Sequence, residues 1–91
     1  MARALADHDM DALIARNIIP HPTNPGLDEY WLAEPGVPVW AVIGAYKAEG
    51  GDVEEVATAY RLSREQVDAA LAYYQRHRTL LDNRLAQNQS A

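Results

Sequence analysis

The chain has 91 residues, 48% of them apolar, and carries 13 acidic against 8 basic side chains, for a formal net charge of -5. This length allows one small domain with a modest core, and such domains often gain further buried area by forming oligomers. Because the chain has no cysteine, disulfides, thiolate metal clusters and thiol nucleophiles are excluded. The acidic balance argues against a nonspecific nucleic-acid coat, since phosphate binding depends on clustered lysine and arginine.

Membrane insertion and export are not expected. The longest uncharged apolar run, residues 37–46, is about half as long as a bilayer span requires. The N-terminus lacks the basic stretch and following apolar stretch of a signal sequence. We therefore expect a cytoplasmic protein. Its charge is uneven, because residues 1–60 are acidic whereas residues 61–91 carry a small basic excess, which suits an anionic partner.

The N-terminal segment predicts a short helix over residues 2–17. Its apolar residues recur at the spacing that marks one helix face, at Met10, Leu13 and Ile14. Asp9 or Asp11 is able to cap the start of this helix. Residues 19–26 contain three prolines, Pro20, Pro22 and Pro25, which fix the backbone and remove donors. They predict an extended strap that separates an arm, residues 1–26, from the rest of the chain.

A short β-hairpin is expected after the strap. Residues 29–32 are rich in aromatic and apolar side chains, and Pro35-Gly36 marks a turn before Val37. A hairpin this small is marginally stable alone. Its unpaired edge is able to pair with a second chain, which offers a route to a dimer.

Two short helices are predicted next, each with one apolar face. Pro38 fits the first turn of the first helix, and Gly50-Gly51 ends it. Asp52 is placed to cap the second helix, with Glu55 three residues later as in a capping box. The apolar residues at helical spacing are Val39, Val42, Ile43 and Tyr46 in the first helix and Val53, Val56, Ala57 and Tyr60 in the second.

The third predicted helix opens at Ser63 and is the longest. Gln66 follows three residues later, which repeats the capping-box spacing. The apolar stripe is long enough to predict a helix of more than about twenty residues. This stripe consists of Val67, Ala70, Leu71, Tyr74, Leu81 and Leu85. The polar tail over residues 87–91 is expected to fray.

The second and third of these helices, joined by Arg61-Leu62-Ser63, have the layout of a helix-turn-helix. Ala57 is small enough for close helix contact, and Leu62 and Val67 occupy positions where such a motif buries apolar side chains. Arg61 lies where many such motifs have glycine, so a left-handed turn there would carry strain. The alternative is that any three-helix domain can show this pattern.

Four short segments form a recognisable set: Val37-Pro38-Val39-Trp40, Gly51-Asp52-Val53-Glu54-Glu55-Val56, Leu62-Ser63-Arg64-Glu65-Gln66-Val67 and Ala69-Ala70-Leu71-Ala72-Tyr73-Tyr74. Together they resemble the domain-of-unknown-function 433 (DUF433) family over about residues 27–85. The resemblance implies a compact winged-helix or homeodomain-like helix-turn-helix with a short N-terminal hairpin. It also implies a VapB-type antitoxin that pairs with a PIN-like nuclease toxin and binds its own promoter as a dimer. The chain departs from the family in having Glu34-Pro35-Gly36 where Gly-Thr-Arg is frequent, and in its N-terminal arm.

The start of the third helix is the best candidate for contacts with DNA. The candidate residues are Arg61, Ser63, Arg64, Gln66 and Lys47. Arg64 is able to pair with a guanine edge or a phosphate, and Gln66 with adenine. Farther along the same outer face, Glu65 and Asp68 would oppose phosphates. Each candidate is also explained as a cap or a solvated surface charge.

A second apolar stripe flanks the first on the third helix, which is more apolar surface than a single core needs. We expect this flank and nearby aromatic residues to contact a second copy or another partner. The residues concerned are Tyr30, Trp31, Trp40, Ala69, Tyr73 and Leu80. A core position for both tryptophans is an equally good interpretation.

Catalysis is not expected. The segment Asp7-His8-Asp9-Met10-Asp11 is dense in potential metal ligands, but on a helix only its two ends share a face. There is no Gly-rich phosphate loop, nucleophile elbow or metal-binding helix motif. We therefore expect no catalytic residue, no metal site and no cofactor.

The sequence as a whole predicts a mainly α protein: an N-terminal helical arm and strap over residues 1–26, a three-helix helix-turn-helix domain with a short hairpin over 27–86, and a polar tail over 87–91. The expected function is a small DNA-binding transcriptional regulator, the antitoxin of a toxin–antitoxin pair, acting as a homodimer. The alternative is a protein-interaction or scaffold module without significant DNA affinity, which the acidic charge and the second apolar stripe favour.

Overall fold

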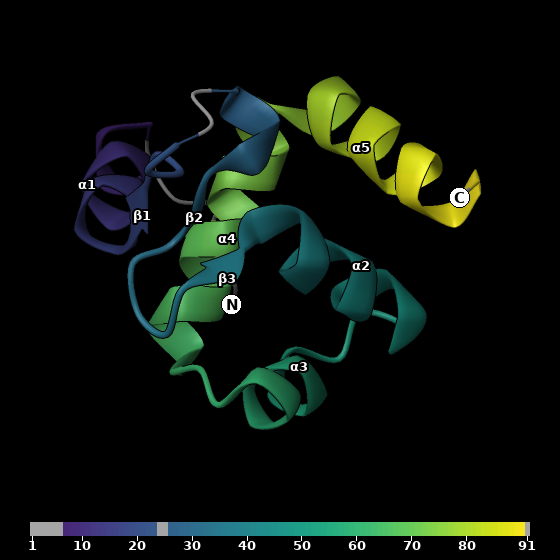
Figure 1. Cartoon of the computed structure of the whole chain (residues 1–91). Helices are drawn as coiled ribbons and strands as arrows, with labels where there is room; N and C mark the ends of the chain where they lie inside the picture. The colour runs from purple at the N-terminus through teal and green to yellow at the C-terminus, as the bar shows by residue number, and fades with distance from the viewer. Residues whose placement is uncertain (1–6, 24–25, 91) are drawn as a thin grey trace.

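The computed structural model describes residues 7–23 and 26–90, and within these ranges it has five α-helices and three short strands (Figure 1). The helices are α1 (Asp7–Asn17), α2 (Val39–Ala48), α3 (Val53–Tyr60), α4 (Arg64–Arg76) and α5 (Arg78–Ser90). The strands are β1 (Ile18–Ile19), β2 (Trp31–Leu32) and β3 (Val37–Pro38), and a single 3-10 turn, η1, covers Leu27–Glu29. The predicted mainly helical fold with a small hairpin is confirmed.

The predicted hairpin is formed by β2 and β3, which pair antiparallel with Leu32 opposite Val37. Its turn closes through a hydrogen bond from the Gly36 N–H to the Leu32 carbonyl at 3.0 Å. Gly36 has a φ of 89°, a conformation that glycine adopts without steric cost. The hairpin therefore depends on the Pro-Gly turn that the sequence marks.

A third strand, β1, was not predicted. It pairs antiparallel with β2, and its β-branched Ile18 lies opposite Leu32. The strand order is β1-β2-β3, so β1 covers the edge of β2 from within the chain. The hairpin edge that seemed available to a second chain is, on this side, already paired.

The core lies where the helices and the sheet meet. Its fully buried side chains are Leu32, Val39, Val42, Ile43, Val56, Val67 and Leu81. Burying each of these aliphatic side chains stabilises the fold by about 1.5–3 kcal/mol. The predicted stripe on the third helix is confirmed in this core, because Val67, Ala70 and Leu81 are buried there.

Helix α1 belongs to the same packed body. Leu13 and Ile18 are buried in the common core cluster, and the most extensive helix contact of α1 is with α4. The packing is therefore continuous across residue 26, where the sequence suggested a division between arm and domain. Asp9 and Asp11 lie inside α1, so their predicted role as helix caps is wrong. Residues 2–6 of the predicted helix lie outside the described residues.

The predicted long third helix is two helices. It breaks at His77, which has φ -128° and ψ 40° and whose N–H donates to the carbonyls of Tyr73 and Tyr74. Figure 1 shows α5 turning away from the direction of α4, and α5 packs on α2. An unbroken helix would carry Leu81 past the end of the core in which it is buried. The helix also continues through the predicted polar tail to Ser90.

Candidate functional site

Helices α3 and α4 form a helix-turn-helix whose starts are fixed by side chains. At α3, Asp52 Oδ1 accepts a hydrogen bond from the Glu55 N–H at 3.2 Å. At α4, Ser63 Oγ accepts from the Gln66 N–H at 3.1 Å, and Gln66 Oε1 accepts from the Ser63 N–H at 2.8 Å. Both predicted caps are confirmed, and the second is a complete capping box.

The turn between the two helices is left-handed at Arg61, which has φ 56° and ψ 46°. The Leu62 N–H donates to the Ala57 carbonyl at 2.8 Å and closes the end of α3. The Leu62 side chain is buried beneath the turn. A non-glycine residue in this conformation costs about 1–2 kcal/mol, so the strain expected from the sequence is present. The Arg61 side chain is exposed.

Four of the five predicted DNA-contacting residues lie together in one segment. Arg61, Ser63 and Arg64 are exposed, and Gln66 is half-buried beside them. The fifth, Lys47, lies in the last turn of α2, where its Nζ donates to Asp82 Oδ1 at 2.9 Å. The Lys47 pKa is raised by its contacts with Tyr74 and Asp82.

The candidate DNA-contacting side chains differ in the number of partners that they have within the chain. Arg64 lies 3.4 Å from Glu54 Oε1 and 3.3 Å from Asp68 Oδ1. Gln66 Nε2 donates to the Glu34 carbonyl at 2.6 Å. The side chain of Arg61 makes no hydrogen bond or ion pair with any described residue. The exposed ion pairs of Arg64 are worth little in water, so an outside anion could replace them.

Most cations of the described chain are paired with its own carboxylates. The pairs are Arg16 with Glu65, Lys47 with Asp82, Arg64 with Glu54 and Asp68, Arg76 with Asp11, and Arg84 with Asp28 and Glu29. The small basic excess of residues 61–91 is therefore largely neutralised by acids from other elements.

Helix α1 covers the face of α4 that points away from α2 and α3. We call this the outer face of α4 and define it by Glu65, Ala69, Ala72, Tyr73 and Arg76. Ala69, Ala72 and Tyr73 are each at most 4% exposed. Glu65 accepts hydrogen bonds from Asn17 at 3.0 Å and Arg16 at 3.4 Å, and both contacts lower its pKa. At the far end, Arg76 pairs with Asp11.

This arrangement corrects part of the predicted partner interface. Ala69 and Tyr73 are buried by their own chain, so they are not available on the surface of this fold. The Tyr73 hydroxyl donates to the Leu27 carbonyl at 2.6 Å, and burial raises its pKa. Leu80 is half-buried. The second apolar stripe has an occupant within the chain, which the sequence pattern could not identify.

The predicted aromatic interface residues also pack within the chain. The Tyr30 ring stacks on Tyr73 with 5.6 Å between centroids. The Trp31 ring lies 4.9 Å from His21, and the Arg84 guanidinium lies 4.9 Å from the Trp40 ring. The indole N–H groups of Trp31 and Trp40 are buried without a hydrogen-bond acceptor among the described residues. Both tryptophans are partly buried, as the core interpretation expects.

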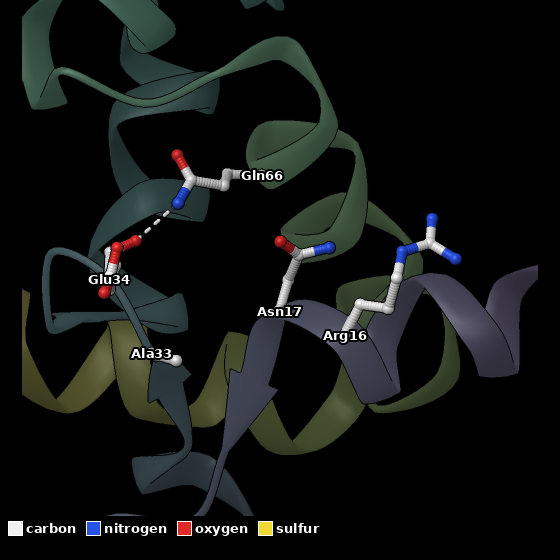
Figure 2. A pocket seen from close by; sticks show the side chains of 5 residues that line it. All are labelled: Arg16, Asn17, Ala33, Glu34 and Gln66. Carbon is white, nitrogen blue, oxygen red and sulfur yellow. Dashed lines mark hydrogen bonds between the residues drawn. The ribbon is translucent and has the colours of Figure 1, made fainter.

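A pocket of about 280 Å³ lies between the end of α1, the β2–β3 turn and the start of α4. Its lining residues are Arg16, Asn17, Ala33, Glu34 and Gln66. Figure 2 shows Gln66 and Glu34 on one side, joined by their hydrogen bond, and Asn17 across from them. The sequence did not identify Asn17 or Glu34 with the start of α4, because this contact depends on tertiary packing.

Two other kinds of site are absent from the described part of the chain. No three His, Asp or Glu side chains converge there in a way that could hold a metal ion. None of its helices has both the length and the apolar character needed to cross a bilayer.

A comparison with known protein families gives a match, and the matched region includes the helix-turn-helix. The model of a family described as "Protein of unknown function (DUF433)" matches residues 30–74, from the hairpin to α4. Helices α1 and α5 lie outside this match. No curated protein and no solved structure matches the chain. The chain belongs to the DUF433 family.

Proposed function

We propose that this protein is a small DNA-binding transcriptional regulator that acts as a homodimer. The observation that carries the proposal is the left-handed turn at Arg61, which joins two capped helices over a buried Leu62. In a helix-turn-helix, the N-terminal residues of the second helix reach base edges. Here that helix is α4, and Arg64 is its first residue.

The candidate contacts have different chemical roles. Arg61 is exposed and unpaired among the described residues, so it is free to bind a phosphate. Arg64 can exchange its exposed carboxylate partners for a phosphate or for the two acceptors of guanine. Ser63 and Gln66 hold the helix start in place. Arg61 and Arg64 therefore carry most of the expected affinity.

The biological setting proposed for this regulator follows from its family resemblance. The protein would be the antitoxin of a cytoplasmic toxin–antitoxin pair, with a PIN-like nuclease toxin as its partner and its own promoter as its DNA target. A homodimer would place two helix-turn-helix motifs on two half-sites, whose spacing is set by the symmetry of the dimer.

The test is fluorescence anisotropy with DNA from upstream of the gene, with scrambled DNA as competitor. Arg61→Ala and Arg64→Ala are each expected to weaken binding by roughly 5-fold to 100-fold. The matched control is Arg78→Ala, because Arg78 is an exposed arginine that contacts the Tyr74 ring from α5. Wild-type protein that does not bind at low salt, or an equal loss in all three variants, contradicts the proposed site.

A second candidate function is a protein-interaction module without useful DNA affinity. It is favoured by the acidic net charge and by the pairing of Arg16, Arg64 and Arg76 with carboxylates of the chain. Such a module would copurify with the product of a neighbouring reading frame and would ignore the upstream DNA. Copurification measured together with anisotropy separates the two functions.

A further inference from the structure

The position of α1 conflicts with the way in which a recognition helix binds DNA. The major groove of B-DNA is about 12 Å wide, and an α-helix with its side chains is about 10–12 Å across. The groove therefore admits one helix. Two packed helices, whose axes lie about 8–10 Å apart, are too wide. While α1 covers the outer face of α4, that face cannot enter the groove.

The contacts show how α1 lies on α4. Asp11 pairs with Arg76 near the end of α4, whereas Arg16 and Asn17 bond to Glu65 near its start. The two helices are therefore antiparallel. The polar contacts tie the middle and the C-terminal end of α1 to the two ends of α4, and the buried side chains of Ala69, Ala72 and Tyr73 lie between these ends.

The packing of α1 on α4 is extensive, but few side chains of α1 are fully buried in it. Among the described side chains of α1, Leu13 alone is buried, with Met10 and Ile14 partly buried. The Arg16–Glu65 pair is exposed, with side-chain exposures of 58% and 51%. Pairs of this kind are weak in water, and a helix of 11 residues is marginal by itself. Local release of α1 therefore requires less free energy than global unfolding does.

The carboxylates of α1 would oppose DNA binding, in addition to the space that the helix occupies. Asp9 and Asp11 are exposed, so α1 places carboxylates beside the helix proposed to approach phosphates. Helix α1 also lies outside residues 30–74, the part that matches the family. It is thus an addition to the matched region, docked on its proposed recognition helix.

We infer that α1 is an autoinhibitory element: while it is docked along α4, with Arg16 and Asn17 bonded to Glu65, it blocks the close approach of DNA to the start of that helix, where Arg61 and Arg64 lie. This inference rests on the proposed DNA-binding function. The bound state requires α1 to detach, so the apparent dissociation constant is the intrinsic one divided by the fraction of molecules in which α1 is released. Linkage also requires that bound DNA promote the release of α1.

The test uses the full chain with the double substitution Asp11→Asn/Arg16→Gln. This variant keeps the net charge and removes the ion pairs that join α1 to the two ends of α4. A second variant adds Leu13→Ala, which weakens the apolar contact. The matched control, Asp9→Asn/Arg78→Gln, is also charge-neutral but leaves the α1–α4 contacts intact. Backbone amide hydrogen exchange reports the opening of α1, and anisotropy on the upstream DNA reports affinity.

The expected result is quantitative. The factor by which a variant speeds exchange in α1, with α2 and α3 unchanged, equals the factor by which it strengthens specific binding, and the control changes neither. Saturating DNA speeds exchange in α1 of the wild-type protein. If α1 opens faster and the affinity stays constant, the inference is wrong and the DNA-binding function stands.

Two other outcomes overturn the inference in different ways. If neither the wild type nor the variants bind the DNA although α1 opens, the proposed function fails and the inference fails with it. If exchange in α1 stays as slow as in the core even in the triple variant, α1 is a fixed part of the fold and not a releasable cover.

Discussion

The amine of Lys47 lies 2.9 Å from Oδ1 of Asp82, so the last turn of α2 is tied to α5. The Tyr74 hydroxyl donates to the same oxygen at 2.8 Å. One carboxylate thus joins α2, α4 and α5 just beyond the helix break at His77. The contacts with Lys47 and Tyr74 lower the Asp82 pKa.

This contact predicts a stability that depends on pH. The folded state lowers the Asp82 pKa below its usual value of 3.8. The contacts of the Asp82 carboxylate therefore stabilise the fold fully at pH values above 3.8, and this stabilisation is lost as the pH falls through the pKa of the folded state. We expect the wild type to lose more stability than Asp82→Asn when the pH is lowered from 5 to below 3. Urea unfolding midpoints measure this, with Glu49→Gln as an exposed-carboxyl control. Parallel curves for wild type and Asp82→Asn would show that the contact contributes nothing.

A second pH dependence is expected from His77 at the helix break. Burial, and then the charge of Arg76, lowers the His77 pKa below its usual value of 6.5. The unfolded chain therefore binds the proton more readily than the folded chain does. The stability associated with neutral His77 is fully present above pH 6.5 and is lost as the pH falls through the pKa of the folded state. We expect the melting temperature to drop between pH 7.5 and 5 in the wild type and less in His77→Gln. His8→Gln, which changes an exposed histidine, is the control.

An NMR titration provides a direct check on the same residue. The His77 ring lies 4.4 Å from the Tyr73 ring, so its resonances can be distinguished by their ring-current shifts. A titration midpoint at or above 6.5 would contradict the described burial of His77.

Arg61→Gly is predicted to separate stability from binding. Glycine adopts the left-handed conformation at φ 56° without a Cβ clash, so this variant should gain about 1 kcal/mol in its free energy of unfolding. Arg61→Ala keeps the clash and should show no such gain. Both variants lose the guanidinium and should bind the upstream DNA more weakly. Chemical denaturation and anisotropy on the same samples measure the two effects, and equal stability of the two variants would argue against strain at this turn.

Tyr73 is predicted to be a stability residue. Tyr73→Phe removes the hydrogen bond to the Leu27 carbonyl and should cost about 1 kcal/mol. Tyr73→Ala also leaves a cavity where the ring packs against Tyr30 and His77 and should cost about 3–5 kcal/mol. Denaturation measures both changes, and light scattering measures the mass. A stable Tyr73→Ala variant with a smaller assembled mass would instead restore Tyr73 to a partner interface.

The features that the sequence predicted well are local. Asp52 and Ser63 cap their helices through residues three positions away, and the Pro35-Gly36 turn closes a hairpin a few residues long. The strain at Arg61 was predictable for the same reason, because that residue lies where many helix-turn-helix motifs have glycine. Patterns of this kind determine structure before any distant contact forms.

The features that the sequence missed depend on distant contacts. The apolar stripe with Ala69 and Tyr73 was visible, but nothing in its spacing could show that α1, some fifty residues earlier, covers it. The helix break at His77 has no glycine or proline to mark it, and it accompanies the packing of α5 on α2 and the burial of Leu81 in the core. β1 is only two residues long, too short for a period-2 pattern to appear.

The pairing of arginines with carboxylates inside the chain has a consequence for measurements at different ionic strengths. When Arg64 leaves Glu54 and Asp68 to bind a phosphate, it frees carboxylates that then attract cations from solution. The cations taken up by the protein offset those released from the DNA, so this contact adds little to the slope of affinity against salt. Arg61 has no described partner to give up, so its contact should add nearly one full ion to that slope. The slope of affinity against salt concentration would therefore reflect only those arginines that have no carboxylate partner in the free protein.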